Sequence, residues 1–170
     1  CAHEFTILIF PLLFLSNVMR IEKVIENKKR HIDLLLLADE QEDMIDRYLE
    51  RGEMYVMRDE DGEAIAVAVV TVEDDDTVEL KNLAVAETEQ GKGYGKLMIE
   101  YICESYSDKF SMLLVGTGDV DATVGFYKHC GFSYSHMIKD FFTEHYDHPI
   151  YEDGVQLIDM VCLKRNIDIV

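Results

Sequence analysis

The chain has 170 residues, of which 48% are hydrophobic and 29% charged, a balance typical of one folded globular domain and not of a disordered chain. With 34 acidic and 16 basic residues, the formal net charge is -18, which excludes general binding to nucleic acid or to an anionic membrane surface. The same charge suits a cationic partner. The alternative interpretation is that the negative charge only keeps the protein soluble. The four cysteines contain no CxxC pair, so we expect a reducing, cytoplasmic location.

The N-terminal segment differs from the rest of the chain. Residues 5–15 (FTILIFPLLFL) are an apolar run too short to cross a bilayer as a helix, and the basic flank of a secretory signal does not precede it. From Met19 onward the sequence has the pattern of an ordinary folded domain. We therefore expect residues 1–18 to be an upstream or artefactual segment and residues 19–170 to form a single domain.

A strand and a helix are expected first. Residues 20–26 (RIEKVIE) alternate apolar and polar side chains, which predicts a strand. Residues 31–51 carry apolar side chains at mainly helical spacing and Gly52 is typical of a helix C-terminus, so we predict one continuous helix. Its acidic side chains, Asp39 among them, are typical of a solvated helix face.

Strand patterns follow in the middle of the chain. Two β-rich runs, at residues 54–58 and 64–72, flank the turn Asp59-Glu60-Asp61-Gly62. An Asp-Gly turn between such runs predicts a β-hairpin. Residues 77–85 (TVELKNLAV) then predict a third antiparallel strand.

The second half of the chain alternates strand and helix patterns. We predict strands at 111–115, 132–138 and 155–163, helices at 93–106 and 122–129, and a loop at 139–154. Together with the first half, this order predicts an α/β fold with a mixed, mainly antiparallel sheet flanked by helices.

A glycine-rich turn joins the third β-run to the next helix and contains Gly91, Gly93 and Gly95 in the segment QGKGYGK. Glycines let the backbone approach a bulky anion, because no Cβ is in the way. The first amides of a helix have no partner within the helix, and the helix dipole adds partial positive charge there. Lys92 and Lys96 can add charge at the rim. The turn therefore predicts a diphosphate site in an otherwise acidic chain.

The spacing of this turn excludes two common phosphate-binding loops. A Walker A loop needs Ser or Thr after its lysine, and here Leu97 follows Lys96. The dinucleotide fingerprint needs its third glycine one residue later than Gly95. A glycine-rich turn alone is a weak signal, so a nucleotide-binding protein stays open on this pattern.

Three motifs carry a resemblance to a known family. QGKGYG matches the signature Q/R-x-x-G-x-G/A of the GNAT acetyltransferase superfamily, and LKNLAV before it resembles that family's fourth strand. GFYKHCGF, at residues 125–132, looks like the family's fYeklGF motif. Order and separation of the elements over residues 19–163 also fit. The resemblance implies a GNAT-like acyl-CoA N-acyltransferase fold, in which the fourth and fifth strands splay apart and acetyl-CoA lies in the gap.

The resemblance also implies an activity. The chain would transfer acetyl from acetyl-CoA to a primary amine of a small molecule or peptide, by direct attack in a ternary complex. Besides the nucleotide-binding protein, the sequence leaves a second alternative open, a non-catalytic acyl-CoA-binding or regulatory module. Because relatives are often dimers, a homodimer also stays open.

The cofactor contacts follow from the same resemblance. The pantetheine arm would pair with strand backbone at Leu83, Ala84 and Val85. Many members have an asparagine after the fifth strand, and here we expect Asp119 to make that contact. The pyrophosphate would rest on the turn and the first helical residues, which are Gln90, Gly91, Lys92, Gly93, Tyr94, Gly95 and Lys96.

Two residues are candidates for proton transfer. Tyr127 matches a tyrosine that lies near the thioether sulfur in many members, where its phenol can protonate the departing thiolate. Glu79 aligns with a glutamate base of some relatives, and a water chain is the alternative acceptor of the amine proton. Strand alternation predicts that Glu79 and Lys81 share a face with Leu83 and Val85. The plain alternatives are a packing tyrosine and a surface glutamate paired with Lys81.

Residues 141–154 lie where the family often builds part of its acceptor pocket. Aromatic and acidic side chains of this segment, Phe142, Glu144 and Tyr146 among them, would suit a cationic amine. The two histidines of its HxxH sequence lie in a proline-containing loop and not on a helix, so we expect no metal. Polyamine, aminoglycoside, free amino acid and protein N-terminus all stay open as acceptors.

Overall fold

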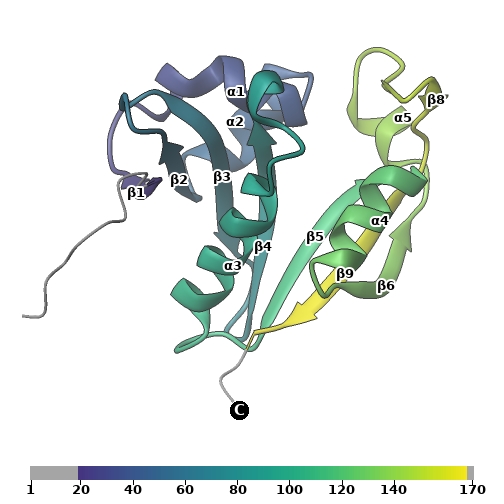
Figure 1. Ribbon diagram of the computed structural model, residues 1–170. Helices are drawn as coiled ribbons and strands as arrows, with labels where there is room; N and C mark the ends of the chain where they lie inside the picture. The colour runs from purple at the N-terminus through teal and green to yellow at the C-terminus, as the bar shows by residue number, and fades with distance from the viewer. Residues whose placement is uncertain (1–18, 168–170) are drawn as a thin grey trace, which may run out of the picture.

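The computed structural model describes residues 19–167, which form a seven-stranded sheet in the order β1-β2-β3-β4-β5-β9-β6 with helices on both faces (Figure 1). The predicted upstream segment, residues 1–18, lies outside the described residues. The strands of the large sheet are β1 (Arg20–Val24), β2 (Glu53–Arg58), β3 (Ala64–Val72), β4 (Thr77–Val85), β5 (Met112–Gly118), β6 (Ser133–Ile138) and β9 (Met160–Asn166). A separate ribbon pairs β7 (Tyr151–Glu152) with β8 (Val155–Gln156). The helices are α1 (Ile32–Ala38), α2 (Glu42–Leu49), α3 (Tyr94–Tyr106), α4 (Asp121–His129) and α5 (Phe141–His145), with short 3₁₀ helices η1 (Lys28–His31) and η2 (Glu87–Glu89).

The first half of the sheet consists of antiparallel strands, and it includes the predicted hairpin. β2 pairs with β3, β3 pairs with β4, and β1 joins the other edge of β2. The turn between β2 and β3 closes with a hydrogen bond from the amide of Gly62 to the carbonyl of Asp59 (3.1 Å). Gly62 has a φ of 84°, which glycine adopts without strain. The predicted class, an α/β fold with a mixed and mainly antiparallel sheet, is confirmed.

The single helix predicted over residues 31–51 is wrong. The chain forms two helices, α1 and α2, separated by a turn in which Asp39 is extended (φ -144°, ψ 106°). The carbonyl of Gln41 then accepts hydrogen bonds from the amides of Met44 and Ile45 (3.1 and 3.2 Å), which starts α2. The turn contains neither glycine nor proline, so the leucine spacing on its N-terminal side continues without a visible break into the next helical pattern.

The strand predicted over residues 155–163 is wrong as well. β8 and β9 are separate strands, because the backbone between them bonds to the segment before β8 and not to the large sheet. The amide of Leu157 donates to the carbonyl of Ile150 (2.8 Å). The loop predicted over residues 139–154 contains the short helix α5 and the strand β7.

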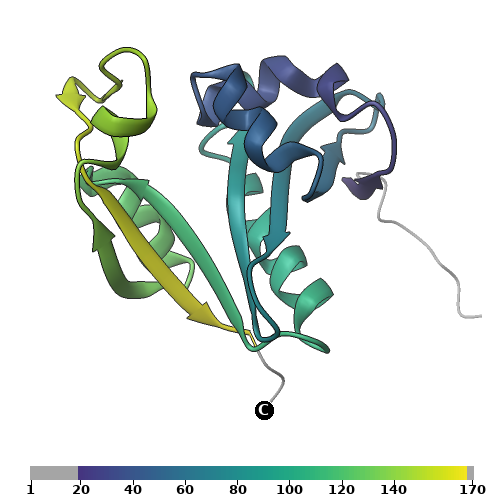
Figure 2. The ribbon, with the colours of Figure 1, turned by 180° about the vertical axis from the view of Figure 1, so that it is seen from behind.

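β4 and β5 are parallel neighbours, and their pairing is short. It runs from Thr77 opposite Met112 to Leu80 opposite Val115 and then stops. Beyond that point the two arms of the sheet diverge, with β1 to β4 in one arm and β5, β9 and β6 in the other (Figure 1 and Figure 2). The splayed central strands implied by the family resemblance are therefore present.

A β-bulge interrupts β4 where the divergence begins. β3 and β4 pair Val70 with Leu80 and Val69 with Asn82, so Lys81 has no partner on β3. An extra residue of this kind shifts the alternation of side chains by one position. Odd-numbered residues of β4 before the bulge therefore lie on the same face as even-numbered residues after it.

Helices cover both faces of the β1–β4 arm. On one face, α1 and α2 bury Leu35, Ile45 and Leu49 against β2 and β3. On the other face, α3 buries Met98 and Ile102 in a larger core that α4 also joins. Figure 1 shows α3 and α4 on the same side of the two arms, and Figure 2 shows α1 and α2 on the opposite side. The divergence between β4 and β5 is therefore flanked by different helices on its two faces.

Candidate functional site

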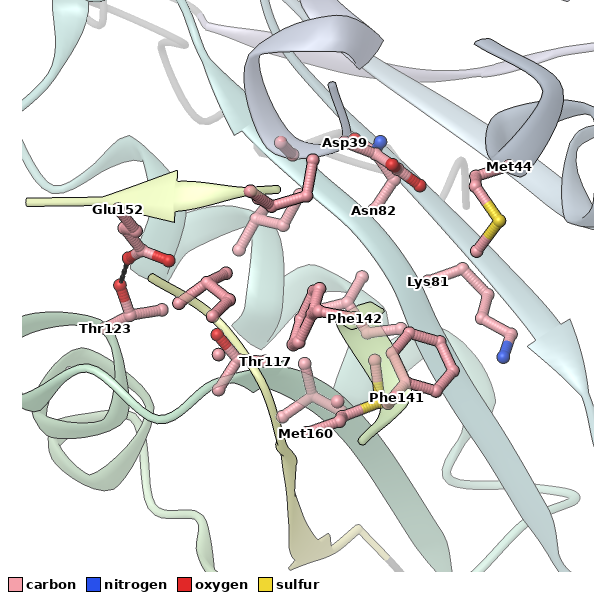
Figure 3. Close-up of a pocket in the computed structure, with 18 of the residues that line it drawn as sticks. Asp39, Met44, Lys81, Asn82, Thr117, Thr123, Phe141, Phe142, Glu152 and Met160 are labelled. Atoms are coloured by element: carbon pink, nitrogen blue, oxygen red, sulfur yellow. Dashed lines mark hydrogen bonds between the residues drawn. The ribbon is translucent and has the colours of Figure 1, made fainter. Parts of the chain in front are cut away.

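Two clefts open where β4 and β5 diverge. The first has a volume of about 900 Å³ and is lined by α1, the α1–α2 turn, β4, β5 and α5, and we call it the α1-side cleft. The second has a volume of about 600 Å³ and lies between β4, the glycine-rich turn, α3 and α4, and we call it the α3-side cleft. Figure 3 shows the α1-side cleft, with Asp39 and Asn82 on one wall and Thr117 and Met160 opposite.

The α3-side cleft is built on the glycine-rich turn. Gly91 and Gly93 have φ values of 75° and 88°, and a Cβ at either position would point into open space. Gly93 immediately precedes α3, whose first residue is Tyr94. Gly95 is needed for a different reason, since a Cβ there would lie 3.1 Å from the ring of Phe126. The turn is therefore open on its cleft side and closely packed toward α4.

Backbone amides at the start of α3 are free to bind an anion. No described residue accepts a hydrogen bond from the backbone N–H of Tyr94, Gly95 or Lys96. The side-chain amide of Gln90 donates to the carbonyl of Val85 (3.0 Å), which holds the turn against the end of β4. Unpaired N–H groups and the dipole of a 13-residue helix together favour a negatively charged ligand.

The two lysines of the turn behave differently. Lys96 lines the α3-side cleft, whereas Nζ of Lys92 lies 2.9 Å from Oε2 of Glu89. The hydrogen bond to Glu89 raises the pKa of Lys92. An anion in this cleft would depend mainly on the backbone amides and on Lys96. An open turn with unpaired donors and no Cβ in the way fits the diphosphate of coenzyme A.

The two clefts meet at the point of divergence. Five residues line both clefts: Leu83, Gln90, Thr123, Tyr127 and Glu152. Thr123 of α4 donates a hydrogen bond to Glu152 of β7 (Figure 3), which joins these two elements at the junction. Thr123 belongs to no motif that the sequence singles out, whereas Glu152 lies in the aromatic and acidic segment 141–154. Ligands in the two clefts would therefore lie against the same five residues.

Tyr127 places a phenol at this junction. Its ring packs edge-on against Phe126 and Phe132, with ring centroids 5.1 and 5.5 Å apart, and its side chain is buried. In the part of the chain that the structure describes, no group hydrogen-bonds its hydroxyl. Burial raises the pKa of Tyr127 well above its ordinary value, so the phenol keeps its proton at neutral pH.

Glu79 lies on a different face from the one predicted. Because the bulge falls at Lys81, Glu79 shares its face with Asn82, whereas Leu83 and Val85 pack toward α3. The predicted common face for Glu79, Leu83 and Val85 is therefore wrong. Glu79 still lines the α1-side cleft, and Nζ of Lys81 lies 2.9 Å from its Oε2.

The segment around α5 supplies aromatic side chains to the α1-side cleft. Phe142 and Tyr146 stack with ring centroids 5.6 Å apart, and Phe142 is buried with Ile150 and Leu157. Tyr146 donates a hydrogen bond to Oδ1 of Asp39 (2.9 Å), which connects this segment to the α1–α2 turn. The second arm of the sheet and the helical layer of the first arm are thus joined across the cleft.

Asp39 is a candidate that the sequence pattern does not reveal. The hydroxyl of Tyr48 donates to its Oδ2 (3.3 Å) and accepts a hydrogen bond from Nδ2 of Asn82 (3.0 Å). Burial raises the pKa of Asp39. A continuous helix would leave Asp39 on a solvated face, and the break after α1 instead brings it into the cleft.

Most of the residues predicted to contact ligands line one or both clefts. Four do not: Ala84 is buried in the α1–α2 cluster, Asp119 and Glu144 are exposed, and Lys92 bonds to Glu89. The predicted residues that do line a cleft are Glu79, Leu83, Val85, Gln90, Gly91, Gly93, Tyr94, Gly95, Lys96, Tyr127, Phe142 and Tyr146.

Residues 19–167 also contain histidine, cysteine and acidic side chains outside the two clefts. In that range, no cluster of three or more His, Cys, Asp or Glu side chains is arranged to hold a metal ion. Cys103, Cys130 and Cys162 are free and buried. None of the described helices combines the length and the apolar character needed to cross a membrane.

Comparisons with known proteins agree with this geometry. A sequence model of the acetyltransferase (GNAT) family matches residues 22–132. The chain belongs to the GNAT family. It is 40% identical over 151 residues to the uncharacterized N-acetyltransferase YvbK of Bacillus subtilis, and the match covers 88% of this chain and 97% of that relative.

Solved structures of GNAT proteins share the whole architecture. A GNAT acetyltransferase from Elizabethkingia anophelis, solved with acetyl-CoA bound, is 33% identical with a TM-score of 0.83, over 87% of this chain and 97% of that one. An IAA acetyltransferase from Bacillus cereus is 35% identical with a TM-score of 0.80, over 88% of this chain and 99% of that one. This GNAT chain is accordingly an acetyl-CoA-dependent N-acetyltransferase.

Proposed function

We propose that this GNAT enzyme acetylates a primary amine of a small molecule or peptide by direct attack on acetyl-CoA in a ternary complex. The observation that carries the proposal is the meeting of two clefts at Leu83 and Tyr127. One cleft has a cradle for an anion, and the other has acidic and aromatic side chains suited to a cation. Two ligands of opposite charge can thus reach one point from opposite faces of the sheet.

The α3-side cleft would hold acetyl-CoA, which supplies an activated thioester. Backbone amides from Gly91 to Lys96 would bind its diphosphate, and the backbone of β4 from Leu83 to Val85 would pair with its pantetheine arm. The edge of β4 is available there because its pairing with β5 ends at Leu80. A contact from Asp119 stays a prediction.

Tyr127 and Glu79 would serve the two proton transfers. An ammonium group has no lone pair, so it must lose a proton before attack, and Glu79 can accept it directly or through water. The neutral nitrogen then forms the new C–N bond while the C–S bond breaks. The departing thiolate takes the proton of the Tyr127 phenol, which burial keeps protonated at neutral pH. The nitrogen gives up its surplus proton as it becomes an amide, and that proton returns to the Tyr127 phenolate through water.

A screen of primary amines tests the reaction itself. Purified protein with acetyl-CoA should release free CoA thiol and form an equal amount of acetylated amine with at least one acceptor. The acetylated product is identified by mass spectrometry. Firm CoA binding without release for any amine would instead favour the non-catalytic acyl-CoA-binding module.

Gly93→Ala tests the cradle. The added methyl group would enter the space proposed for the diphosphate and disturb its charge-assisted hydrogen bonds, so Kd for CoA should rise about tenfold or more. Gly62→Ala is a matched control, since Gly62 also has a positive φ (84°) and open space around its Cβ, but lies in the β2–β3 turn. Both variants should lose similar stability in thermal unfolding, and calorimetry should show weaker CoA binding only for Gly93→Ala. Equal CoA affinity for the two variants would contradict the placement.

Tyr127→Phe tests the proton donor. Phenylalanine keeps the packing against Phe126 and Phe132, so CoA affinity should hold while kcat falls about 100-fold, the size of a typical general-acid contribution. Steady-state kinetics with the best acceptor of the screen measures this change. Tyr134→Phe, at an exposed position of β6, is the control and should keep wild-type turnover. If Tyr127→Phe also kept it, Tyr127 would be only a packing residue.

Glu79→Gln tests the proton acceptor. We expect kcat/KM at pH 7 to fall about 100-fold, and the deficit to shrink as the pH approaches the amine's own pKa of about 10, where the base is no longer needed. A pH profile of kcat/KM for both proteins measures the effect. Glu87→Gln removes the same charge at an exposed position outside both clefts and should leave the profile unchanged. A constant deficit at every pH would argue against Glu79 as the base.

A further inference from the structure

Asp39 and Asn82 lie on one wall of the α1-side cleft (Figure 3). Neither of them lines the α3-side cleft. Asn82 is 3% exposed, and its Nδ2 donates to the carbonyl of Leu35 and to the hydroxyl of Tyr48, both at 3.0 Å. Its Oδ1 has no hydrogen-bond partner among the described residues. A buried oxygen left unpaired is costly, which points to a donor supplied by a ligand.

The donors around Asp39 are already in use. Tyr146 donates to Oδ1 (2.9 Å), Tyr48 donates to Oδ2 (3.3 Å) and the backbone N–H of Gln41 also donates to the carboxylate, while both N–H bonds of the Asn82 amide are directed elsewhere. The groups that remain open are acceptors: the other lone pairs of the Asp39 carboxylate and Oδ1 of Asn82. An ammonium group has three donors and no acceptor, so it is the complementary ligand.

Asp39 also lacks a cationic partner. No Lys or Arg nitrogen in the described range lies within 4.0 Å of its carboxylate. Three Lys or Arg side chains line the same cleft: Lys81 pairs with Glu79 (2.9 Å), Arg51 pairs with Glu73 (3.1 Å), and Arg47 lies more than 4.0 Å from the Asp39 carboxylate. Burial raises the pKa of Asp39, so its hydrogen bonds do not fully replace the lost hydration. A bound cation would supply the missing compensation.

We propose that Asp39 and Asn82 bind a protonated amino group of the acceptor, and that this is not the group acetylated. The attacking nitrogen must be neutral, whereas a group that donates its N–H bonds to a carboxylate keeps its protons and has no free lone pair. The amine that reacts is placed beside Glu79, a different carboxylate of the same cleft. The acceptor therefore carries at least two amino groups, as a diamine or polyamine does. This inference rests on the proposed function and narrows its substrate class.

A series of matched amines tests the proposal on the wild-type protein. Unbranched α,ω-diamines of several chain lengths are compared with the monoamines of equal carbon number, by CoA release. The second charge should raise kcat/KM about tenfold or more for the diamine whose length best spans the distance from Asp39 and Asn82 to the reacting amine. Equal values for diamines and monoamines at every length would overturn the subsite and leave the acetylation of amines standing.

Two variants test whether Asp39 causes the advantage of diamines over monoamines. Asp39→Asn keeps the shape of the side chain and should remove most of the advantage of diamine over monoamine, chiefly through KM. Asp33→Asn removes the same charge from an exposed position of α1 outside both clefts, and should keep that advantage. An advantage that persists in Asp39→Asn would overturn the assignment. CoA calorimetry confirms that each variant is folded, and if Asp39→Asn is not, the wild-type series decides.

Calorimetry of the amines separates this proposal from the proposed function. One outcome would support the subsite and overturn the transfer reaction. In it, diamine binding to the protein–CoA complex weakens about tenfold in Asp39→Asn, while no diamine causes CoA release from acetyl-CoA. Failure of every diamine to bind the wild-type complex would overturn the subsite, whatever the monoamines do.

Discussion

The short parallel pairing of β4 with β5 is the constraint on which the site depends. Once pairing stops at Leu80 and Val115, each strand keeps a partner on one side only, β3 for β4 and β9 for β5. Backbone groups along the free edges need partners, and an extended ligand can provide them. The helices on either face, together with the small cluster under α5, hold the two arms apart and keep this edge accessible. The gap in the hydrogen-bond ladder thus leaves a cleft on each face of the sheet.

The bulge at Lys81 makes the α1-side cleft and the α3-side cleft chemically different. It shifts the alternation of β4, so that Glu79 and Asn82 share the α1 face while Leu83 and Val85 pack toward α3. Without the extra residue, the polar and apolar side chains of β4 would be mixed on both faces. With it, the α3 face offers a backbone edge and a glycine turn, and the α1 face offers carboxylate and amide oxygens.

Charged and polar groups are also divided between the two clefts. The chain carries a net charge of -18, yet the start of α3 offers unpaired amides and Lys96, which favour an anion locally. The α1-side cleft concentrates acceptors, with Asp39 half-buried and without an ion pair to Lys or Arg among the described residues. Short-range groups therefore decide where each ligand can bind, and the net charge sets only the general preference for cations.

Local patterns in the sequence determined the elements that depend on local rules. The hairpin at Asp59 to Gly62, the strand at 77–85 and the glycine turn before α3 all follow from turn chemistry and period, and the family motifs added the splay. Tertiary structure alone decided the break at Asp39 and the bulge at Lys81, because neither has a glycine, a proline or a change of period to mark it. It also placed Asp39 beside Tyr146, 107 residues away, and Thr123 beside Glu152. Such pairs arise from packing between distant segments, on which local propensity carries no information.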